Sequence, residues 1–256
     1  MTPPLAFLGD FGGAVDFIFH SRHTATGADV GGHHNLGLLA THLELVAAAM
    51  AIAILIALPL GLLLGHSGRA AFLTISVSNI GRAVPSIALI AVFYAFLPAL
   101  ANFATVTLAL ALLAIPPILT NTYVGVRQVD RDTVDAARGM GLSESGVLRS
   151  VELPLALPLI FGGIKTSTVN VIATATIAPL AGVVTLGDPL TSFAVYRREG
   201  QIGASIIVAV LAIAAEVGLS AVQRAVTPAG VKLERGRGSR ARARFGLTKR
   251  RIQTAP

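Results

Sequence analysis

The sequence contains no cysteine and no tryptophan, and only 13% of its 256 residues are charged. The absence of cysteine excludes a disulfide scaffold, a thiolate metal site and cysteine catalysis. Soluble domains carry about 25% charged residues, so this chain has roughly half the usual charge. Apolar side chains make up 54% of it, and the mean hydropathy is +0.74. Helices that are apolar on all sides are typical of a protein embedded in lipid.

The net charge of +7 is concentrated at one end of the chain. Ten of the 20 Lys and Arg residues lie from Arg224 onward, where Glu234 is the only acidic residue. A pI of 10.8 would suit a nucleic-acid binder, but this charge lies in a tail rich in Arg, Gly, Ala and Ser. We expect residues 229–256 to be disordered and to meet anionic membrane lipid and not nucleic acid.

Hydropathy predicts an all-α, multi-pass membrane bundle of about five helices, because about 20 apolar residues suffice to cross a bilayer. The predicted spans are residues 45–65, from about 83 to 98, 103–123, 158–184 and 202–222. Arg82 and Pro85 interrupt the hydropathy before the second span, so residues 70–81 are expected to follow the interface. Residues 1–37 are expected to form an extracytoplasmic segment, either an interfacial helix or a loosely ordered terminus.

The basic residues of the short loops set the orientation. One side of the predicted bundle collects the tail together with Arg69, Arg127, Arg131, Arg138 and Arg149. The other side holds Arg22, Arg197 and Arg198, partly offset by acidic residues. We therefore predict that the N-terminus lies outside the cell and that the C-terminus is cytoplasmic.

Residues 125–152 form the only long polar stretch inside the hydrophobic part of the chain. Asp130 or Asp132 is placed to cap a helix and to complement its dipole. This helix would carry the small residues Ala136 and Ala137 on a docking face. The pattern predicts a short helical projection at the cytoplasmic mouth of the bundle.

Glycine and proline mark the ends of the helices in this projection. Gly139 and Gly141 are expected to end the first helix, since glycine readily adopts the left-handed conformation at a helix C-terminus. Ser143 can cap a second short helix. Pro154 is then expected to turn the chain back into the membrane.

This segment resembles the cytoplasmic coupling loop of ABC importer permeases, which reads Glu-Ala-Ala, three residues, Gly, nine residues, then Ile-x-Leu-Pro. The chain keeps every spacing, with Asp for the Glu and Val for the Ile. The matching positions are Asp135, Ala136, Ala137, Gly141, Val151, Leu153 and Pro154. The resemblance implies a type I importer permease of the MetI-like fold, whose loop 127–153, Gly139 included, is coupled to a separate ATPase.

Residues 38–228 as a whole are similar to the osmoprotectant branch of these permeases, which carry glycine betaine, carnitine, choline or proline. The similar stretches are Ile80–Ser86, Asn121–Val126, Asp135–Met140 and Leu186–Asp188. The resemblance implies a bacterial cell membrane, a second permease subunit, two cytoplasmic ATPases and an extracytoplasmic solute-binding protein. No phosphate-binding glycine loop is present, so ATP and Mg²⁺ would bind to the ATPase, and this chain would be neither an enzyme nor a holder of a cofactor or metal.

Charged and proline residues within the spans are candidates for the translocation pathway. Arg82, Pro85 and Glu216 are the candidates here. Arg82 either extends its head group to the interface or pairs with Glu216, and Lys165 is expected to extend to the interface. His20, His23, His33 and His34 have no supporting acidic or cysteine pattern, so we predict no metal site.

Three other functions stay open from the sequence. The chain could be an importer permease for a different small solute, such as an amino acid. It could be a secondary transporter driven by an ion gradient. It could also be a membrane-anchored nucleic-acid binder that uses the basic tail.

Overall fold

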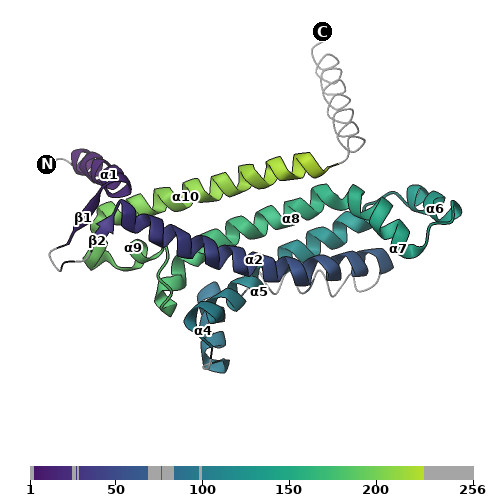
Figure 1. The fold of residues 1–256 in the computed structure, drawn as a ribbon, viewed down its shortest axis with the longest axis horizontal. Coiled ribbons are helices and arrows are strands. Elements are labelled where there is room, and N and C mark those ends of the chain that lie inside the picture. The colour runs from purple at the N-terminus through teal and green to yellow at the C-terminus, as the bar shows by residue number, and fades with distance from the viewer. Residues whose placement is uncertain are drawn as a thin grey trace, which may run out of the picture.

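The computed structural model describes residues 3–24, 27, 29–68, 76, 84–97 and 100–227. Apart from Ser76, the predicted interfacial segment 70–81 lies outside the described residues, as do Arg82 and the tail 229–256. Within the described part the long helices run side by side along one axis, with short elements at both ends (Figure 1). The arrangement confirms the predicted all-α membrane fold.

The elements follow one another as a short N-terminal helix and hairpin, then the long helices with short helices between them. Their bounds are α1 Pro3–Phe19, β1 Ser21–His23, β2 Asp29–Gly31, α2 His33–Ser67, α4 Ser86–Phe96, α5 Asn102–Arg127, α6 Arg131–Gly139, α7 Glu144–Val147, the π-helical turn η1 Leu148–Glu152, α8 Leu153–Thr174, the 3₁₀ segment η2 Ala175–Ala181, α9 Asp188–Thr191 and α10 Phe193–Val226.

Four helical segments in the described part are long and apolar enough to cross a membrane, fewer than the five expected. They are α2, α5, the continuous stretch Glu144–Ala181 and α10. The predicted span from about 83 to 98 is helical over only 11 residues in α4, about 16 Å, and cannot cross alone. Pro85 is the N-cap of α4, and the residues just before Val84 lie outside the described part.

The first long helix begins earlier than hydropathy predicts. α2 starts at His33, twelve residues before the predicted start of the span, so the segment boundary expected between residues 37 and 38 falls inside a helix. At 35 residues α2 is about 52 Å long. It therefore extends beyond the hydrocarbon core of a bilayer, which is about 30 Å thick.

A close contact between α2 and α5 runs along a row of small residues on α2. The row is buried, recurs every four residues and consists of Ala49, Ala53, Ala57, Gly61 and Gly65. A Cβ on Gly61 would lie 2.6 Å from Thr122 Cβ, and one on Gly65 would lie 2.7 Å from Val126 Cβ. Small residues at this spacing let two membrane helices approach closely, and here they bring α2 onto α5.

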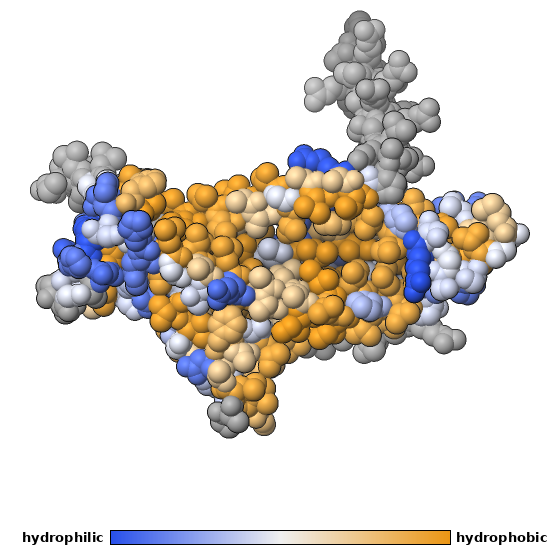
Figure 2. Space-filling view, viewed as in Figure 1, coloured by the Kyte–Doolittle hydropathy of each residue, from blue (hydrophilic) through white to orange (hydrophobic). Residues whose placement is uncertain are grey.

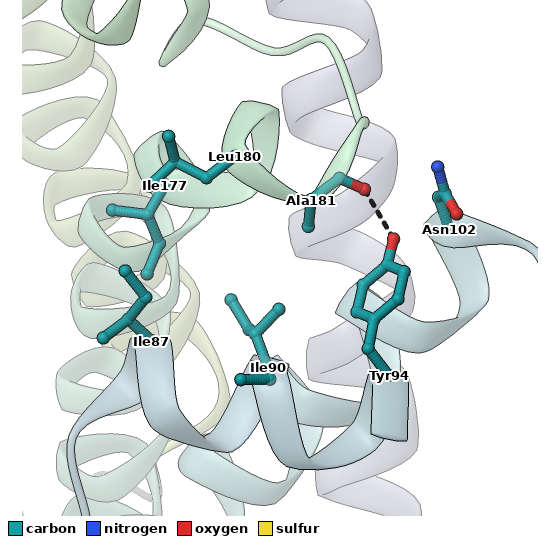
Figure 3. A pocket seen from close by; sticks show the side chains of 8 residues that line it. Ile87, Ile90, Tyr94, Asn102, Ile177, Leu180 and Ala181 are labelled. Atoms are coloured by element: carbon teal, nitrogen blue, oxygen red, sulfur yellow. Dashed lines mark hydrogen bonds between the residues drawn. The ribbon is translucent and has the colours of Figure 1, made fainter. Parts of the chain in front are cut away.

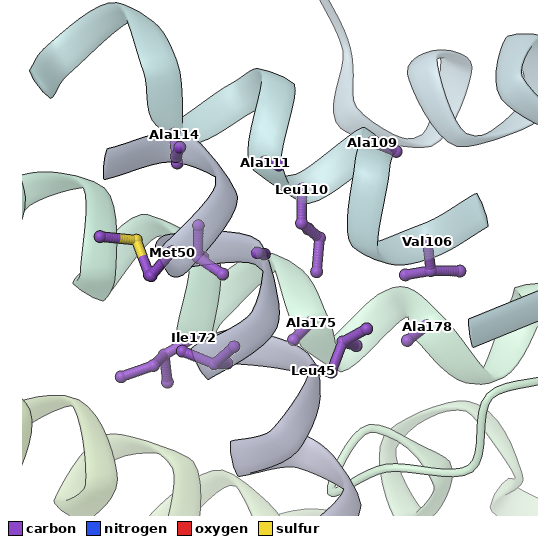
Figure 4. Packing of buried hydrophobic residues seen from close by; sticks show 14 of the residues in the cluster. Leu45, Met50, Val106, Ala109, Leu110, Ala111, Ala114, Ile172, Ala175 and Ala178 are labelled. Carbon is purple, nitrogen blue, oxygen red and sulfur yellow. The ribbon is translucent and has the colours of Figure 1, made fainter. Parts of the chain in front are cut away.

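The hydrophobic core lies between α2, α5 and α8, and alanines and branched side chains fill it (Figure 4). Leu45 of α2, Leu110 of α5 and Ile172 of α8 each have at most 1% of their surface exposed. α5 is the central helix, because both α2 and α8 pack along it, while α10 packs on the far side of α8. α10 itself keeps a mostly exposed apolar surface.

The N-terminal segment is a folded cap on the start of α10. α1 packs against α10, where Phe17 meets Tyr196 edge to face with ring centroids 6.1 Å apart. β1 and β2 pair antiparallel, and Arg22 bridges Asp16 at 3.2 Å and Glu199 at 3.1 Å. Of the two alternatives for this segment, a helix is the correct one, and contacts with α10 hold it in place.

The surface divides into an apolar band and two polar ends (Figure 2). Apolar side chains cover the long helices, whereas polar ones gather around α1 and the hairpin at one end and around α6 and α7 at the other (Figures 1 and 2). The side-chain amide of Gln223 donates to the Pro158 carbonyl at 3.3 Å, so the end of α10 lies beside the start of α8. The chain therefore leaves α10 at the end that carries α6 and α7.

Candidate coupling site and membrane pathway

The coupling knob, defined as residues 127–153, has a hydrophobic core of its own. Val129, Val134, Ala137 and Val147 are buried together, and Leu142 and Val151 pack against them. Ala137 is 2% exposed, so the expectation that it lies on a docking face is wrong. Its small side chain lets α6 pack onto the rest of the knob, whereas Ala136 is exposed as predicted.

The predicted helix ends of the knob are confirmed in part. Ser143 caps α7, its hydroxyl accepting from the Gly146 amide at 3.3 Å. Gly141 has a φ of +87°, a conformation that an L side chain rarely adopts, whereas Gly139 is the last residue of α6. Asp130 holds the N-cap position of α6, but its carboxylate accepts from the Thr133 hydroxyl at 3.1 Å and caps no backbone amide.

Pro154 does not turn the chain, contrary to expectation. The helical stretch continues from α7 through η1 into α8, and Pro154 lies in the first turn of α8. A proline there would remove the amide that an α-helix pairs with the carbonyl four residues earlier. The π-helical turn Leu148–Glu152 directly before it changes this pairing, and the helix continues unbroken into α8 at Leu153.

The tip of the knob exposes one apolar side chain between charged ones. Met140 follows α6 and is 76% exposed, and the Asp135 carboxylate on the same helix is 69% exposed. Sequence analysis did not single out Met140, although a residue between Gly139 and Gly141 at the end of a helix is expected to be exposed. The tip thus combines a flexible apolar side chain, the small Ala136 and a carboxylate.

Arg138 holds the two helices of the knob together. Its guanidinium donates two parallel hydrogen bonds of 3.0 Å to the carboxylate of Glu144 and one of 3.1 Å to Asp135. These bonds, the Glu144 pair above all, favour the charged carboxylate, so Arg138 lowers the pKa of Glu144 from its ordinary value. The helical stretch that begins at Glu144 has 38 residues and is about 57 Å long. Because the hydrocarbon core of a bilayer is only about 30 Å thick, the polar start of this stretch lies outside it.

A histidine at the end of α2 contacts the knob from the bundle side. His66 Nδ1 lies 2.6 Å from Glu152 Oε2, and its Nε2 lies 3.1 Å from Glu144 Oε2. The Glu152 side chain is only 5% exposed. Sequence analysis missed this contact because His66 and Glu152 are 86 residues apart, and no local pattern indicates it.

A pocket with a polar lining lies among α4, α5 and α8. It has a volume of about 280 Å³, and its polar side chains are Ser86, Asn170 and Thr174. Asn170 is exposed on α8. The predicted pathway residue Pro85 lies between Val84 and Ser86, which both line this pocket.

Glu216 lies elsewhere, on α10. Its carboxylate is 3.6 Å from Lys165 Nζ, and Lys165 also donates to the Ser220 hydroxyl at 3.2 Å. The Lys165 side chain is 19% exposed, so it turns toward α10 and does not extend to the interface as expected. The alternative partner of Glu216, Arg82, lies outside the described residues, and no described contact joins Glu216 to Pro85.

A larger, mainly apolar cavity of 420 Å³ lies between α4 and η2. Ile87, Ile90 and Tyr94 of α4 face Ile177 and Leu180 across it (Figure 3). The Tyr94 hydroxyl closes one side by donating to the Ala181 carbonyl at 2.5 Å. Among the described residues, no group of three His, Asp or Glu side chains could hold a metal ion.

A family model described as the binding-protein-dependent transport system inner membrane component matches residues 40–229. The chain belongs to this family of permeases. It is therefore a multi-pass membrane component of a transport system and not an enzyme. As the description of the family says, such a component belongs to a transport system that depends on a binding protein.

The permease is also similar to individual relatives. It is 35% identical over 192 residues to the choline transport system permease protein OpuBB of Bacillus subtilis, covering 75% of this chain and 88% of that one. It is 34% identical over 208 residues to the carnitine transport permease protein OpuCB of Listeria monocytogenes, covering 81% and 94%. A solved inward-facing structure of the MetNI methionine ABC transporter superposes with a TM-score of 0.67 at 20% identity, covering 77% of the permease and all of that chain. This likeness confirms the predicted MetI-like fold.

Proposed function

We propose that this permease is a transmembrane subunit of an ABC importer for osmoprotectants such as glycine betaine, carnitine, choline or proline. One observation carries the proposal: the coupling knob is a helical projection with its own core that exposes Asp135, Ala136 and Met140 beyond the apolar band. Such a rigid projection can fit a groove on an ATPase and transmit its movement. The names of the relatives OpuBB and OpuCB support the class of solute.

The knob is proposed to lie in the cytoplasm. Arg127, Arg131, Arg138 and Arg149 lie at its end of the bundle, and the tail with nine further basic residues follows α10 at that end. At the other end Arg22, Arg197 and Arg198 lie among the carboxylates of Asp10, Asp16, Asp29, Asp188 and Glu199. Basic residues in short loops favour the cytoplasmic side, which puts the N-terminal cap outside, toward the solute-binding protein, and lets the tail meet anionic lipid.

Movement of the knob is proposed to pass directly into the bundle. α7, η1 and α8 form one continuous helical stretch, so a push on the knob acts along α8. Closure of two ATPases, with ATP and Mg²⁺ bound between them, would move two such knobs. The spans of this permease and of a second permease subunit would then switch between inward and outward opening.

The pocket lined by Ser86, Asn170 and Thr174 is proposed as one wall of the solute pathway. An exposed asparagine within a membrane helix is costly unless it faces a polar cavity or a partner, and Asn170 has no hydrogen-bond partner among the described residues. Pro85 would shape this wall by starting α4 there. Glu216 and, on sequence grounds alone, Arg82 are the other proposed pathway residues.

Reconstitution tests this function. The permease would be purified with its ATPase, placed in liposomes with the solute-binding protein, and given labelled glycine betaine, choline, carnitine or proline. We expect uptake that requires both ATP and the binding protein. Uptake by the permease alone under an ion gradient would contradict the proposal in favour of a secondary transporter, and ATP-driven uptake confined to other amino acids would contradict the solute class.

A further inference from the structure

His66 lies between two carboxylates that belong to different parts of the coupling knob. Its Nδ1 faces Glu152 at 2.6 Å and its Nε2 faces Glu144 at 3.1 Å. A neutral imidazole carries a single N–H, whereas the imidazolium can donate at both nitrogens. The geometry therefore suits a positively charged ring that bonds both carboxylates at once.

The two carboxylates connect His66 to every helical element of the knob. Glu152 ends η1 immediately before α8, and Glu144 starts α7. Glu144 in turn accepts both hydrogen bonds from Arg138 of α6. His66 itself belongs to α2, whose small residues pack on α5 up to Gly65, so one side chain joins the knob to a helix that is distant in sequence.

The contact also spans an irregular turn of the knob. η1 is a π-helical turn, and such turns interrupt the regular α-helical hydrogen-bond pattern and are often found at functional sites. Glu144 precedes this turn and Glu152 ends it, so His66 ties both of its ends to α2. With His66 removed, the buried carboxylate of Glu152 would lose the only partner that the described residues give it.

We propose that His66 is a positioning residue for energy coupling: it holds the knob on α2, so that displacement of the knob moves α2 together with α8. The inference rests on the proposed ATPase-driven function. Without His66, movement of the knob is absorbed at η1, and ATP is hydrolysed without the matching movement of solute.

The test compares His66→Gln with His33→Gln in the reconstituted complex. His33 is exposed at the opposite end of the same helix, so it provides a matched control. We expect His66→Gln to keep ATP hydrolysis near the wild-type rate while the solute moved per ATP falls about five-fold or more. If the amount of solute moved per ATP hydrolysed equals that of the wild type within error, the inference is overturned.

Two further variants assign the effect to the contacts themselves. Glu144→Gln alters a side chain that is 61% exposed, so the fold should tolerate the substitution. We expect this variant to lower the solute moved per ATP less than His66→Gln does. The double variant His66→Gln/Glu152→Gln should lose no more than His66→Gln alone, since residues in contact are not additive. Losses that multiply would show that the two side chains act independently, which contradicts the inference.

A spectroscopic measurement on the permease alone separates this inference from the proposed function. The chain has no native cysteine, so spin labels can be placed at Leu63→Cys on α2 and Ser145→Cys on α7, both exposed. We expect the distance distribution between them to become about twice as broad in His66→Gln. A control pair at Leu55→Cys and Leu112→Cys, on α2 and α5, should stay unchanged.

The two readouts give separable outcomes. An unchanged distribution between residues 63 and 145 overturns the positioning role, whatever the transport result. A broader distribution with an unchanged ratio of solute to ATP overturns the role in coupling. A wild-type complex without ATP-driven uptake contradicts the proposed function instead, and the label distances then still decide whether His66 holds the knob.

Discussion

The ammonium nitrogen of Lys165 lies 3.6 Å from the carboxylate of Glu216 and thereby joins α8 to α10. Lys165 is twelve residues past Leu153, about 18 Å along the helix, so the pair lies within the apolar band. Each charge reduces the cost of holding the other away from water. This relationship explains how a span can carry Glu216 among exposed apolar residues such as Ile213 and Val217.

Neutralising one member of this pair should destabilise the permease more than neutralising both. We expect Lys165→Met or Glu216→Gln to lower the free energy of unfolding by about 1–3 kcal/mol, between the values for exposed and buried pairs. The double variant should recover most of the loss, because no unpaired charge is left. Thermal unfolding in detergent measures this, and a double variant less stable than both single variants would contradict the assignment.

Gly141 should be sensitive to substitution although the space around it is open. A Cβ there meets nothing within 4 Å, but φ is +87°. Gly141→Val would therefore strain the turn between α6 and α7 and displace the tip of the knob. We expect ATP-driven uptake to be abolished while the protein stays inserted in the membrane.

Gly139→Ala provides the control for that variant. Gly139 is helical, and an added Cβ meets nothing within 4 Å, so alanine should favour α6 by about 1 kcal/mol and leave uptake unchanged. Unchanged uptake in Gly141→Val, measured with labelled solute, would count against the coupling role of the knob.

Acid should loosen the knob through Glu144. Because Arg138 holds the folded-state pKa of Glu144 below its ordinary value of 4.5, this interaction contributes fully to stability above that value. The contribution is lost as the pH falls through the lower, folded-state pKa. The chain has no tryptophan, so Leu142→Trp reports on packing in the knob core, and we expect its emission to shift to the red below pH 4.5.

Arg138→Gln in the same tryptophan background isolates this effect. Without the guanidinium, the knob should already be looser at neutral pH, and the change between neutral and acidic pH should be smaller. An acid transition of the same size in both proteins would assign the pH dependence to other carboxylates.

Asn170 should matter for solute movement and not for folding. Asn170→Leu replaces the polar group in the pocket by an apolar one, and we expect uptake to fall about ten-fold with little change in thermal stability. Asn170→Gln keeps the amide and should retain more uptake. Ala209→Leu, on the exposed face of α10, is the control, and equal uptake in Asn170→Leu and Ala209→Leu would remove this pocket from the pathway.

Hydropathy and helix-end chemistry were sufficient for most of the architecture. The central spans, the cap at Ser143 and the left-handed Gly141 all follow from local sequence, because lipid requires long apolar helices and each helix end needs particular residues. Pro154 misled the prediction, since the π-helical turn before it accommodates the proline within an unbroken helix. Ala137 was misplaced because its size alone does not tell a docking face from a buried contact.

Contacts between distant segments could not be predicted. His66 meets Glu152, and Lys165 meets Glu216, only because packing fixes how α2, α8 and α10 are rotated against one another. The small residues from Ala49 to Gly65 recur every four residues, a pattern that indicates close packing against another helix. Sequence analysis did not use this pattern. The N-terminal cap likewise depends on Phe17 meeting Tyr196 across the chain.

Accessibility of a single cysteine at Ala136 tests the central claim most directly. Ala136 is exposed on the knob, and the chain has no other cysteine. With a membrane-impermeant maleimide, we predict no labelling of Ala136→Cys in intact spheroplasts, labelling in inverted vesicles stripped of the ATPase, and protection when the ATPase is added back. Labelling from outside the cell, or labelling that the ATPase leaves unchanged, would contradict the account.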